Sequence, residues 1–440
     1  MKKILLSCLM LFAVSTIKAQ DFSQLDDLLH LLEDNNKLMA TMTITQGGNE
    51  VYAKAVGFAD VENKVANTQD TKFRIGSITK AFTAVMIFQL IDEGRLTLDT
   101  TLSKFYPDVP GASNITIAQM LSHKSGLFNI TNDPKFGEWM LKKSTKVQML
   151  KRIKPYDLDF QPGEKTEYSN TNYILLGYIA EDLDKKNYSD ILKARITDKI
   201  GLKNTYYGGK IDVTSNESQS YAIALEYWAK QLETDMSNPG GAGAIVSTSK
   251  DLTLFMNALF SGKLISASSL EAMKKTDNND VCHGLFYANL NGMDIYASEG
   301  GIDGFQSVLV HVPAMQTTIA LVANGLDYRK IDIMMSAFMV SAGQPIKLPT
   351  FTSIQLTEAQ VKQYEGEYAC DAVPYKLIFK ADGTILMGAP EQSNLKELTP
   401  TKAHQFTFDT LGIVVDFNPE DQTLVFTRGE EAPLKFKRLE

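Results

Sequence analysis

Hydrophobic positions recur at helical spacing in several segments of the chain. From Asp21 to Asn36 the apolar residues follow one another at intervals of three and four, which predicts an amphipathic helix. A second helix is predicted from just after Ser77 to about Glu93, and apolar residues occupy nearly its whole circumference, so we expect it to be buried on all sides. Further helices are predicted at Ile117–Ser122, Lys142–Ile153, Thr171–Asp182, Tyr188–Lys199 and Ile331–Val340.

Runs with the pattern of strands lie on both sides of this helical block. The first two flank the turn Gly47-Gly48-Asn49, whose glycines supply the backbone freedom of a hairpin. A helical block between strands predicts one antiparallel sheet flanked by helices, together with an all-helical subdomain, in the α/β (α+β) class. The predicted strands are Met39–Thr45, Val51–Gly57, Gly284–Leu290, Met293–Ala297, Phe305–Val312 and Thr317–Ala323.

The pattern changes after Ser341–Ser353, a stretch with Gly343, Pro345 and Pro349 that is typical of a linker. Short alternating runs follow and predict a small C-terminal all-β, barrel-like domain. We therefore predict a main domain at 20–342, a linker at 343–352 and a C-terminal domain at 353–440. The predicted C-terminal strands are Tyr375–Lys380, Thr384–Met387, Gln405–Phe408, Ile413–Phe417, Thr423–Thr427 and Leu434–Lys437.

The first residues have the pattern of an export signal. Lys2 and Lys3 precede an apolar run that is too short to span a bilayer, and Ala19 is a small residue suited to signal-peptidase cleavage. We predict a signal peptide at 1–19 and a mature chain that is periplasmic or secreted, with no transmembrane segment. The alternative is a lipid anchor at Cys8, because the preceding residues loosely resemble a lipoprotein box, although most of the apolar run would then follow the cleavage site.

Composition excludes several other classes. The 440 residues are 44% hydrophobic and 22% charged, as in ordinary globular proteins, and the formal net charge of -8 argues against a nucleic-acid partner. No His, Cys and acid cluster has the spacing of metal ligands, so we predict no metal and no cofactor. We expect Cys282 and Cys370 to be free thiols. The expected partner is a small-molecule or peptide substrate, and the oligomeric state stays open.

The segment Ser77-Ile78-Thr79-Lys80 carries candidate catalytic chemistry. It places a hydroxyl at the mouth of the buried helix and an amine one turn later on the same face. A serine becomes a nucleophile when a nearby base accepts its proton, and a lysine desolvated among apolar groups can act as that base. Only Lys80 lies in a helix that is apolar all round, where an unpaired cation is costly. The same spacing also occurs at Ser15/Lys18, Ser247/Lys250 and Ser393/Lys396.

A second candidate is Tyr168-Ser169-Asn170, which lies between a Pro-Gly turn and a predicted helix. A phenol held near a lysine can share in proton transfer, and an amide can orient the nucleophile or a substrate carbonyl. The alternative is a turn that only caps the following helix, since Tyr287-Ala288-Asn289 repeats the spacing inside a predicted strand. On spacing alone, both interpretations stay open.

Taken together, these pieces resemble the serine β-lactamase and penicillin-binding protein superfamily, in the branch of class C β-lactamases and D-alanyl-D-alanine carboxypeptidases. The resemblance implies a β-lactamase-like fold, with Ser77 as the acylated nucleophile, Lys80 as its proton acceptor, and Tyr168 and Asn170 as the second motif. In the matching segment Leu121–Leu127 we interpret His123 as a hydrogen-bonded structural residue. The match runs through Phe73–Lys80, Gly94–Asp99, Leu121–Leu127, Pro162–Glu164, Tyr168–Asn170 and Gly241–Thr248.

The third motif of the superfamily departs from its pattern in this chain. A Lys or His followed by any residue and a Gly is expected on the strand beside the nucleophile, and here the stretch reads Ser298-Glu299-Gly300-Gly301. By position Gly301 supplies the second oxyanion-hole N–H, and Ser298 and Gly300 complete the substrate site. The missing cation puts carboxylate-bearing substrates in doubt, and Glu299 would repel them further if it faced the cleft.

The resemblance thus predicts an exported serine hydrolase that works through an acyl-enzyme on Ser77. Its substrate would be a small amide or ester, such as a D-amino-acid peptide, a β-lactam or a carboxylic ester. The alternative is a catalytically impaired, penicillin-binding-like module that binds peptidoglycan fragments or a partner protein. The intact Ser77, Lys80, Tyr168 and Asn170 favour the enzyme, and Ser298 favours the binding module.

Overall fold

The computed structural model describes residues 20–224, 227–276, 280–429 and 431–439. The predicted signal peptide and the alternative anchor at Cys8 lie outside the described residues. Within the described ranges, no helix has the length and apolar character needed to cross a membrane. Cys282 and Cys370 are free thiols, as predicted.

A six-stranded antiparallel sheet forms the centre of the main region, in the order β10-β11-β12-β13-β1-β2. Strand β1 pairs with β13 from Leu38↔Leu326 to Gln46↔Thr317, so the N- and C-terminal segments of this region close one sheet. This confirms the predicted sheet. The strands are β1 (Leu38–Gln46), β2 (Asn49–Val56), β10 (Phe286–Leu290), β11 (Met293–Ile302), β12 (Phe305–Val312) and β13 (Thr317–Leu326).

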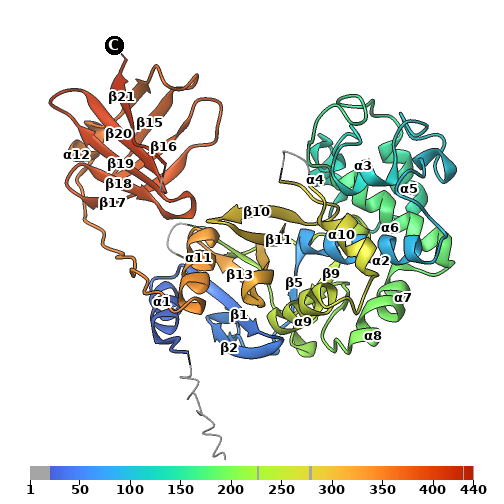
Figure 1. Cartoon of the computed structure of the whole chain (residues 1–440). Helices are drawn as coiled ribbons and strands as arrows, with labels where there is room; N and C mark the ends of the chain where they lie inside the picture. The colour runs from blue at the N-terminus through green and yellow to red at the C-terminus, as the bar shows by residue number, and fades with distance from the viewer. Residues whose placement is uncertain (1–19, 225–226, 277–279, 430, 440) are drawn as a thin grey trace, which may run out of the picture.

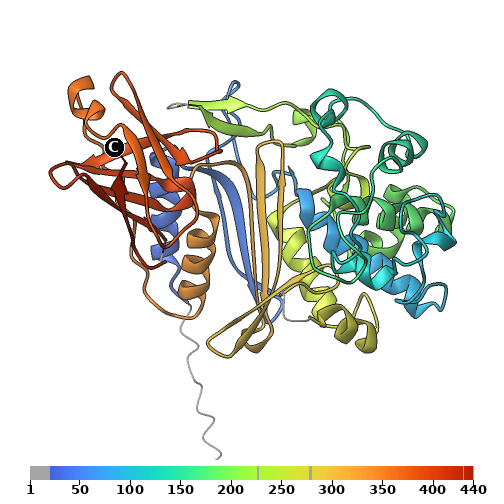
Figure 2. The same cartoon turned by 90° about the horizontal axis from the view of Figure 1, so that it is seen from above.

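Helices cover both faces of the sheet (Figure 2). On one face α1 (Ser23–Asp34) and α11 (Lys330–Ser341) pack on alternate residues of β1 and β13. On the other face lies α9 (Ser249–Phe260), which contributes to a second core around α2 (Thr79–Asp92). Strand residues alternate between the two faces, so β12 and β13 contribute apolar side chains to both cores.

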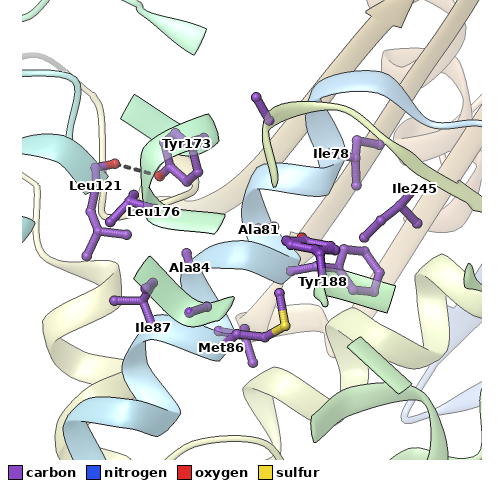
Figure 3. Packing of buried hydrophobic residues seen from close by; sticks show 14 of the residues in the cluster. Ile78, Ala81, Ala84, Met86, Ile87, Leu121, Tyr173, Leu176, Tyr188 and Ile245 are labelled. Atoms are coloured by element: carbon purple, nitrogen blue, oxygen red, sulfur yellow. Dashed lines mark hydrogen bonds between the residues drawn. The ribbon is translucent and has the colours of Figure 1, made fainter. Parts of the chain in front are cut away.

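Helix α2 lies at the centre of the helical subdomain. Every residue from Thr79 to Leu90 is buried, as its all-round apolar pattern predicts. Figure 3 shows Ala81, Ala84 and Ile87 among side chains of neighbouring elements, with the Tyr173 hydroxyl donating to the carbonyl of Leu121 at 2.7 Å. The surrounding helices are α3 (Ile117–Leu121), α4 (Phe136–Trp139), α5 (Lys146–Ile153), α6 (Asn170–Asp184), α7 (Tyr188–Leu192), α8 (Asp198–Ile200) and α10 (Ala267–Lys274).

Several elements differ from the sequence expectations. Helix α5 begins only at Lys146, because Thr145 and Gln148 form a capping box there. The predicted helix at 188–199 is divided by a π-helical turn at Lys193–Thr197. Helices α9 and α10 were not predicted, and neither were several short strands. These are β3 (Phe58–Asp60), β4 (Val65–Ala66), β5 (Phe73–Arg74), β6 (Tyr206–Tyr207), β7 (Tyr221–Ala224), β8 (Tyr227–Lys230) and β9 (Ile245–Ser247).

The C-terminal region is a closed eight-stranded antiparallel barrel, which confirms the predicted barrel-like domain. Its interior is filled by aromatic and aliphatic side chains, including the fully buried Phe406 and Phe436. Strands β14 and β17 and the short helix α12 (Glu358–Lys362) were missed in the sequence. The strands are β14 (Gly366–Ala369), β15 (Leu377–Asp382), β16 (Ile385–Pro390), β17 (Lys396–Lys402), β18 (Gln405–Phe408), β19 (Ile413–Asn418), β20 (Thr423–Arg428) and β21 (Leu434–Arg438).

The barrel lies beside α1 and α11, across the six-stranded sheet from α2 (Figures 1 and 2). Polar contacts join it to the turn after β13: the Thr410 hydroxyl donates to Asp327 at 2.7 Å, and the ammonium of Lys37 lies 2.7 Å from Asp327 and 3.2 Å from Asp409. The domain boundaries at 342 and 353 stay a prediction.

Candidate active site

Ser77 lies in a short 3-10 turn, Gly76–Ile78, that leads into α2. Its hydroxyl oxygen accepts a hydrogen bond from the Lys80 amine at 2.9 Å and another from the Tyr168 hydroxyl at 2.7 Å. Lys80 follows one turn later in the same helix, which places the two side chains on one face. Tyr168 is 91 residues away in sequence and lies just before α6, which begins at Asn170.

Lys80 is only 4% exposed, and its amine has three close partners. Besides Ser77, it donates to Asn170 Oδ1 and to the carbonyl oxygen of Ala242, both at 2.8 Å. No acidic side chain of the described ranges forms an ion pair with it. Burial therefore holds the pKa of Lys80 well below its usual value, because the charged form loses its hydration without gaining a counter-ion.

Asn170 is the first residue of α6, and a loop residue that the sequence analysis missed holds it in place. Asn129 Oδ1 accepts from the backbone N–H of Asn170 at 3.1 Å and from its side-chain amide at 3.3 Å. This leaves Asn170 Oδ1 directed at Lys80. Nothing local marks Asn129, because its contact spans 41 residues of sequence.

Tyr168 has a neutral phenol at physiological pH. Desolvation raises the pKa of the phenol, and the hydrogen bond with Ser77 lowers it by a smaller amount. The resulting pKa of Tyr168 is about 12. A neutral phenol has one proton to donate, and Ser77 is the partner that the structure provides. The interpretation of Tyr168–Asn170 as only a helix-capping turn does not account for these contacts.

His123 also contacts the loop that carries Tyr168. Its Nδ1 accepts from the backbone N–H of Ser169 at 3.2 Å, and its ring centroid lies 4.5 Å from that of Tyr168. Burial, with a smaller contribution from Lys80, lowers the pKa of His123 to about 3, so the imidazole stays neutral. It is buried and hydrogen-bonded, as the structural interpretation requires.

Strand β11 carries the third candidate motif directly against the Ser77 turn. A Cβ added to Gly76 would lie 2.8 Å from the backbone nitrogen of Gly301, and one added to Gly300 would lie 2.0 Å from the carbonyl oxygen of Ile75. Glycine is therefore required at both positions because two backbone segments are in contact. The Gly301 backbone thus lies beside the turn that carries the candidate nucleophile.

Ser298 and Glu299 lie on opposite faces of β11. Ser298 shares its face with Tyr296, which packs into the core around α2, and it is 3% exposed. The Glu299 carboxylate instead forms a 2.6 Å ion pair with Lys330 at the start of α11. The expected repulsion of anionic substrates by Glu299 is therefore reduced, because a cation compensates its charge.

Replacing Gly300 by alanine should separate β11 from the Ser77 turn. The added methyl group would overlap the Ile75 carbonyl and lie 2.5 Å from Ser307 Oγ. We expect kcat/KM to fall roughly 100-fold, the effect of a misplacement of about 1 Å in a catalytic site. Gly137→Ala is the control, since its Cβ would meet nothing within 4 Å. Hydrolysis rates of Gly300→Ala equal to those of the control would contradict this packing.

Comparisons with known proteins identify the family of the chain. The family model described as Beta-lactamase matches residues 28–344. The chain belongs to this family. It is a serine hydrolase of the Beta-lactamase family, and its neighbours among solved structures include amide-cleaving members.

Relatives are similar over most of the chain. Penicillin-binding protein 4* of Bacillus subtilis (strain 168) is 23% identical, with 96% of this chain and 97% of that protein covered. The D-amino acid amidase from Ochrobactrum anthropi SV3 is 26% identical with a TM-score of 0.62, covering 69% of this chain and 91% of the amidase. A D-stereospecific amidohydrolase from Streptomyces sp. is also 26% identical, with a TM-score of 0.63 and coverage of 72% and 98%.

A further structure shares the fold over nearly the whole chain. The octameric penicillin-binding protein homologue from Pyrococcus abyssi has a TM-score of 0.67 at 21% identity, covering 95% of this chain and all of the homologue. The structure brings together Ser77, Lys80, Tyr168 and Asn170 and sets β11 beside them. The catalytic roles of these residues, and of Ser298, Gly300 and Gly301, stay predictions.

Proposed function

We propose that the protein hydrolyses a small amide or ester through an acyl-enzyme on Ser77. The observation that carries this proposal is the contact of Ser77 Oγ with a buried lysine of lowered pKa and with a neutral tyrosine. Such a group of side chains supplies a nucleophile, a base and a proton donor within hydrogen-bonding reach. The complete group also favours an enzyme over the alternative of a binding module.

Lys80 acts as the base in the proposed acylation step. The Ala242 carbonyl and Asn170 Oδ1 are acceptors only, so they bind two N–H groups of the neutral amine. In this neutral form the remaining lone pair faces Ser77, so the 2.9 Å contact, in which the charged amine donates to Ser77 Oγ, becomes one in which the Ser77 hydroxyl donates to Lys80. As Ser77 Oγ forms a bond to the substrate carbonyl carbon, its proton passes to Lys80. The resulting ammonium keeps the same two acceptors.

Tyr168 and two backbone groups complete the step. The phenol is neutral, so it can hand a proton to the leaving nitrogen or oxygen as the bond to the carbonyl carbon breaks. The N–H groups of Ser77 and Gly301 lie on the adjoining turn and strand, and we assign them to the developing oxyanion. Water then attacks the ester on Ser77 and gives one proton to the Tyr168 phenolate. As the Ser77 Oγ–carbon bond breaks, Ser77 Oγ takes back its proton from Lys80, so the acid is released and all three side chains return to their starting states.

The relatives support amides as the substrate class. Two structural neighbours are described as a D-amino acid amidase and a D-stereospecific amidohydrolase. We therefore propose D-amino-acid amides or peptides as the first substrates to test, with carboxylic esters and β-lactams as the other acyl donors. The lysine-flanked apolar run at the N-terminus supports an exported protein that meets these substrates outside the cytoplasm.

A substrate panel tests the proposal. The wild-type protein is exposed in parallel to a p-nitrophenyl ester, to D- and L-phenylalanine amide, to a penicillin and to a fluorophosphonate, and its intact mass is measured after rapid acid quenching. We expect turnover of the ester and of the D-amide, with an adduct of the acyl mass on the peptide that contains Ser77. No turnover and no adduct with any of the five reagents would refute the proposal.

Neutral substrates should be hydrolysed faster than matched substrates with a free carboxylate beside the scissile bond. Ser298 supplies no cation, burial lowers the pKa of Lys80 and so disfavours its charged form, and Lys330 is already paired with Glu299. A carboxylate that enters the cleft thus loses hydration without recovering it. The ratio of kcat/KM for the neutral substrate to kcat/KM for the anionic substrate should be roughly five- to thirtyfold smaller in Ser298→His than in the wild type. This is the effect of one charge-assisted hydrogen bond. A wild-type preference for the anionic substrate would contradict this prediction.

A further inference from the structure

The two backbone N–H groups assigned to the oxyanion lie on segments of different sheets. Ser77 follows β5, which pairs with β9, whereas Gly301 lies on β11, which pairs with β10 and β12. Among the described strands, no backbone ladder joins β5 to β11. The contact between Gly76 and Gly301 limits how closely the two segments approach, but it does not hold them together. Side-chain interactions must therefore fix the distance between the two N–H groups.

A buried ion pair joins these two segments. Arg74 Nη1 donates to Asp303 Oδ2 at 2.7 Å, and the two side chains are 2% and 0% exposed. Arg74 lies three residues before Ser77. Asp303 lies two residues after Gly301, in the turn from β11 to β12. The ion pair thus links the strand that leads to the candidate nucleophile with the strand that carries the second N–H group.

Further hydrogen bonds hold both side chains in one orientation. Arg74 Nη1 also donates to the Thr234 carbonyl at 3.0 Å. Its Nη2 donates to the Gly209 carbonyl at 2.8 Å and to Glu233 Oε2 at 3.3 Å. Asp303 Oδ1 accepts from the backbone N–H and the hydroxyl of Thr234, at 3.0 and 2.8 Å. Because the guanidinium is planar, a rotation of Arg74 would break several of these bonds at once, so the link is rigid.

Stability alone does not account for this ion pair. Two charges lose their hydration in it, and replacing such a pair by apolar residues is often neutral or stabilising. Arg74 Nε is also buried without a hydrogen-bond partner among the described residues. A neutral hydrogen bond, from Ser307 Oγ to the Ile75 carbonyl at 2.8 Å, already ties the Ser77 turn to β12. What the charged pair adds is a stronger and more directional link.

We propose that the ion pair of Arg74 with Asp303 sets the distance between the Ser77 and Gly301 N–H groups, so that both can donate to the developing oxyanion. Arg74 and Asp303 are then positioning residues, and this inference rests on the proposed acyl-enzyme function of Ser77. Oxyanion donors act on the transition state more than on the bound substrate, so their misplacement lowers kcat and leaves KM nearly unchanged. A misplacement of about 1 Å at a catalytic site lowers rates roughly 100-fold.

Two variants separate positioning from a structural role. Arg74→Met leaves the Asp303 carboxylate buried without its cation, which should destabilise the fold, and Arg74→Met/Asp303→Asn removes both charges and should recover much of that stability. We expect kcat for an amide and for an ester to fall roughly 100-fold in both variants, with KM within about threefold of wild type. A purely structural role predicts that kcat recovers together with the stability. Wild-type kcat in the double variant would overturn the proposal.

A matched control breaks another buried ion pair. Arg195 Nη2 donates to Asp184 Oδ1 at 2.8 Å, and the two side chains are 13% and 12% exposed. Asp184 ends α6, roughly 20 Å along the helix from Asn170. Asp184→Asn should therefore lower the denaturant concentration at the unfolding midpoint without changing kcat. A fall in kcat in this control equal to that in Arg74→Met would assign the loss to general destabilisation and overturn the proposal.

Crystal structures give a test that needs no substrate. In Arg74→Met/Asp303→Asn, or in Asp303→Asn alone if the double variant does not fold, we expect the backbone nitrogens of Ser77 and Gly301 to lie roughly 0.5 to 1 Å farther apart than in the wild type. An unchanged separation would overturn the positioning role, whatever the activity. Absence of turnover by the wild type would instead refute the proposed hydrolase function, so the two failures are distinguishable.

Discussion

Ser77→Ala should abolish the formation of covalent adducts with acylating reagents and lower kcat/KM by roughly 10,000-fold or more, as the loss of a catalytic serine does in other hydrolases. The reason is chemical: no other hydroxyl among the described residues contacts both Lys80 and Tyr168. Intact-mass spectrometry after fluorophosphonate treatment and hydrolysis rates for an ester and an amide provide the measurement.

The chain offers a matched control for this substitution. Ser393 and Lys396 repeat the serine-to-lysine spacing in the barrel, where Ser393 is exposed. Ser393→Ala should keep wild-type labelling and rates. If labelling persisted in Ser77→Ala at the wild-type level, or was lost in Ser393→Ala, the assignment of the nucleophile would be wrong.

Lys80→Met removes the amine and keeps a side chain of similar volume. It should slow acylation by roughly 100-fold or more, the usual effect of losing a proton-transfer partner. In the wild type, kcat/KM should rise as pH rises through the pKa of Lys80, because only the neutral amine accepts the Ser77 proton. Stopped-flow acylation rates across the pH range test both statements. Unchanged acylation in Lys80→Met would remove Lys80 from the base role.

The lowered pKa of Lys80 also affects folding stability. Between the folded-state pKa and the unfolded value of 10.5, the unfolded chain binds a proton that the folded chain does not. The free energy of unfolding contributed by Lys80 therefore rises with pH in this window, by up to about 1.4 kcal/mol per pH unit, and levels off above 10.5. The stability difference between the wild type and Lys80→Met, measured by denaturant unfolding at several pH values, should follow this slope. A difference independent of pH would show that the lysine keeps its charge when buried.

Elements with a strong local pattern were predicted well. Helix α2 is buried all round as its composition indicates, and the hairpin at Gly47-Gly48-Asn49 joins the two strands that flank it. The segments that were missed lack such a pattern. Strands β5, β6 and β9 have two or three residues each and exist only because β9 pairs with both of the others. A run of two residues is too short to show a period.

In the candidate site, too, some contacts could be predicted from the sequence and others could not. The pairing of Ser77 with Lys80 follows from helical spacing, because residues three apart lie on one face. The contact of Lys80 with the Ala242 carbonyl spans 162 residues, and that of Asn170 with Asn129 spans 41. Contacts at such separations depend on how the elements pack, which no window of sequence contains.

By itself the sequence determined the sheet with its helical subdomain, the barrel, and the Ser77, Lys80, Tyr168 and Asn170 set as candidates. Periodicity and the types of side chains are properties of neighbouring residues, and they are visible before folding. Only the tertiary structure decided that Lys80 has no acidic partner among the described residues and that Glu299 points toward Lys330. A strand pattern tells which residues share a face, but the direction of that face, its charges and its free volume depend on the segments that pack against it.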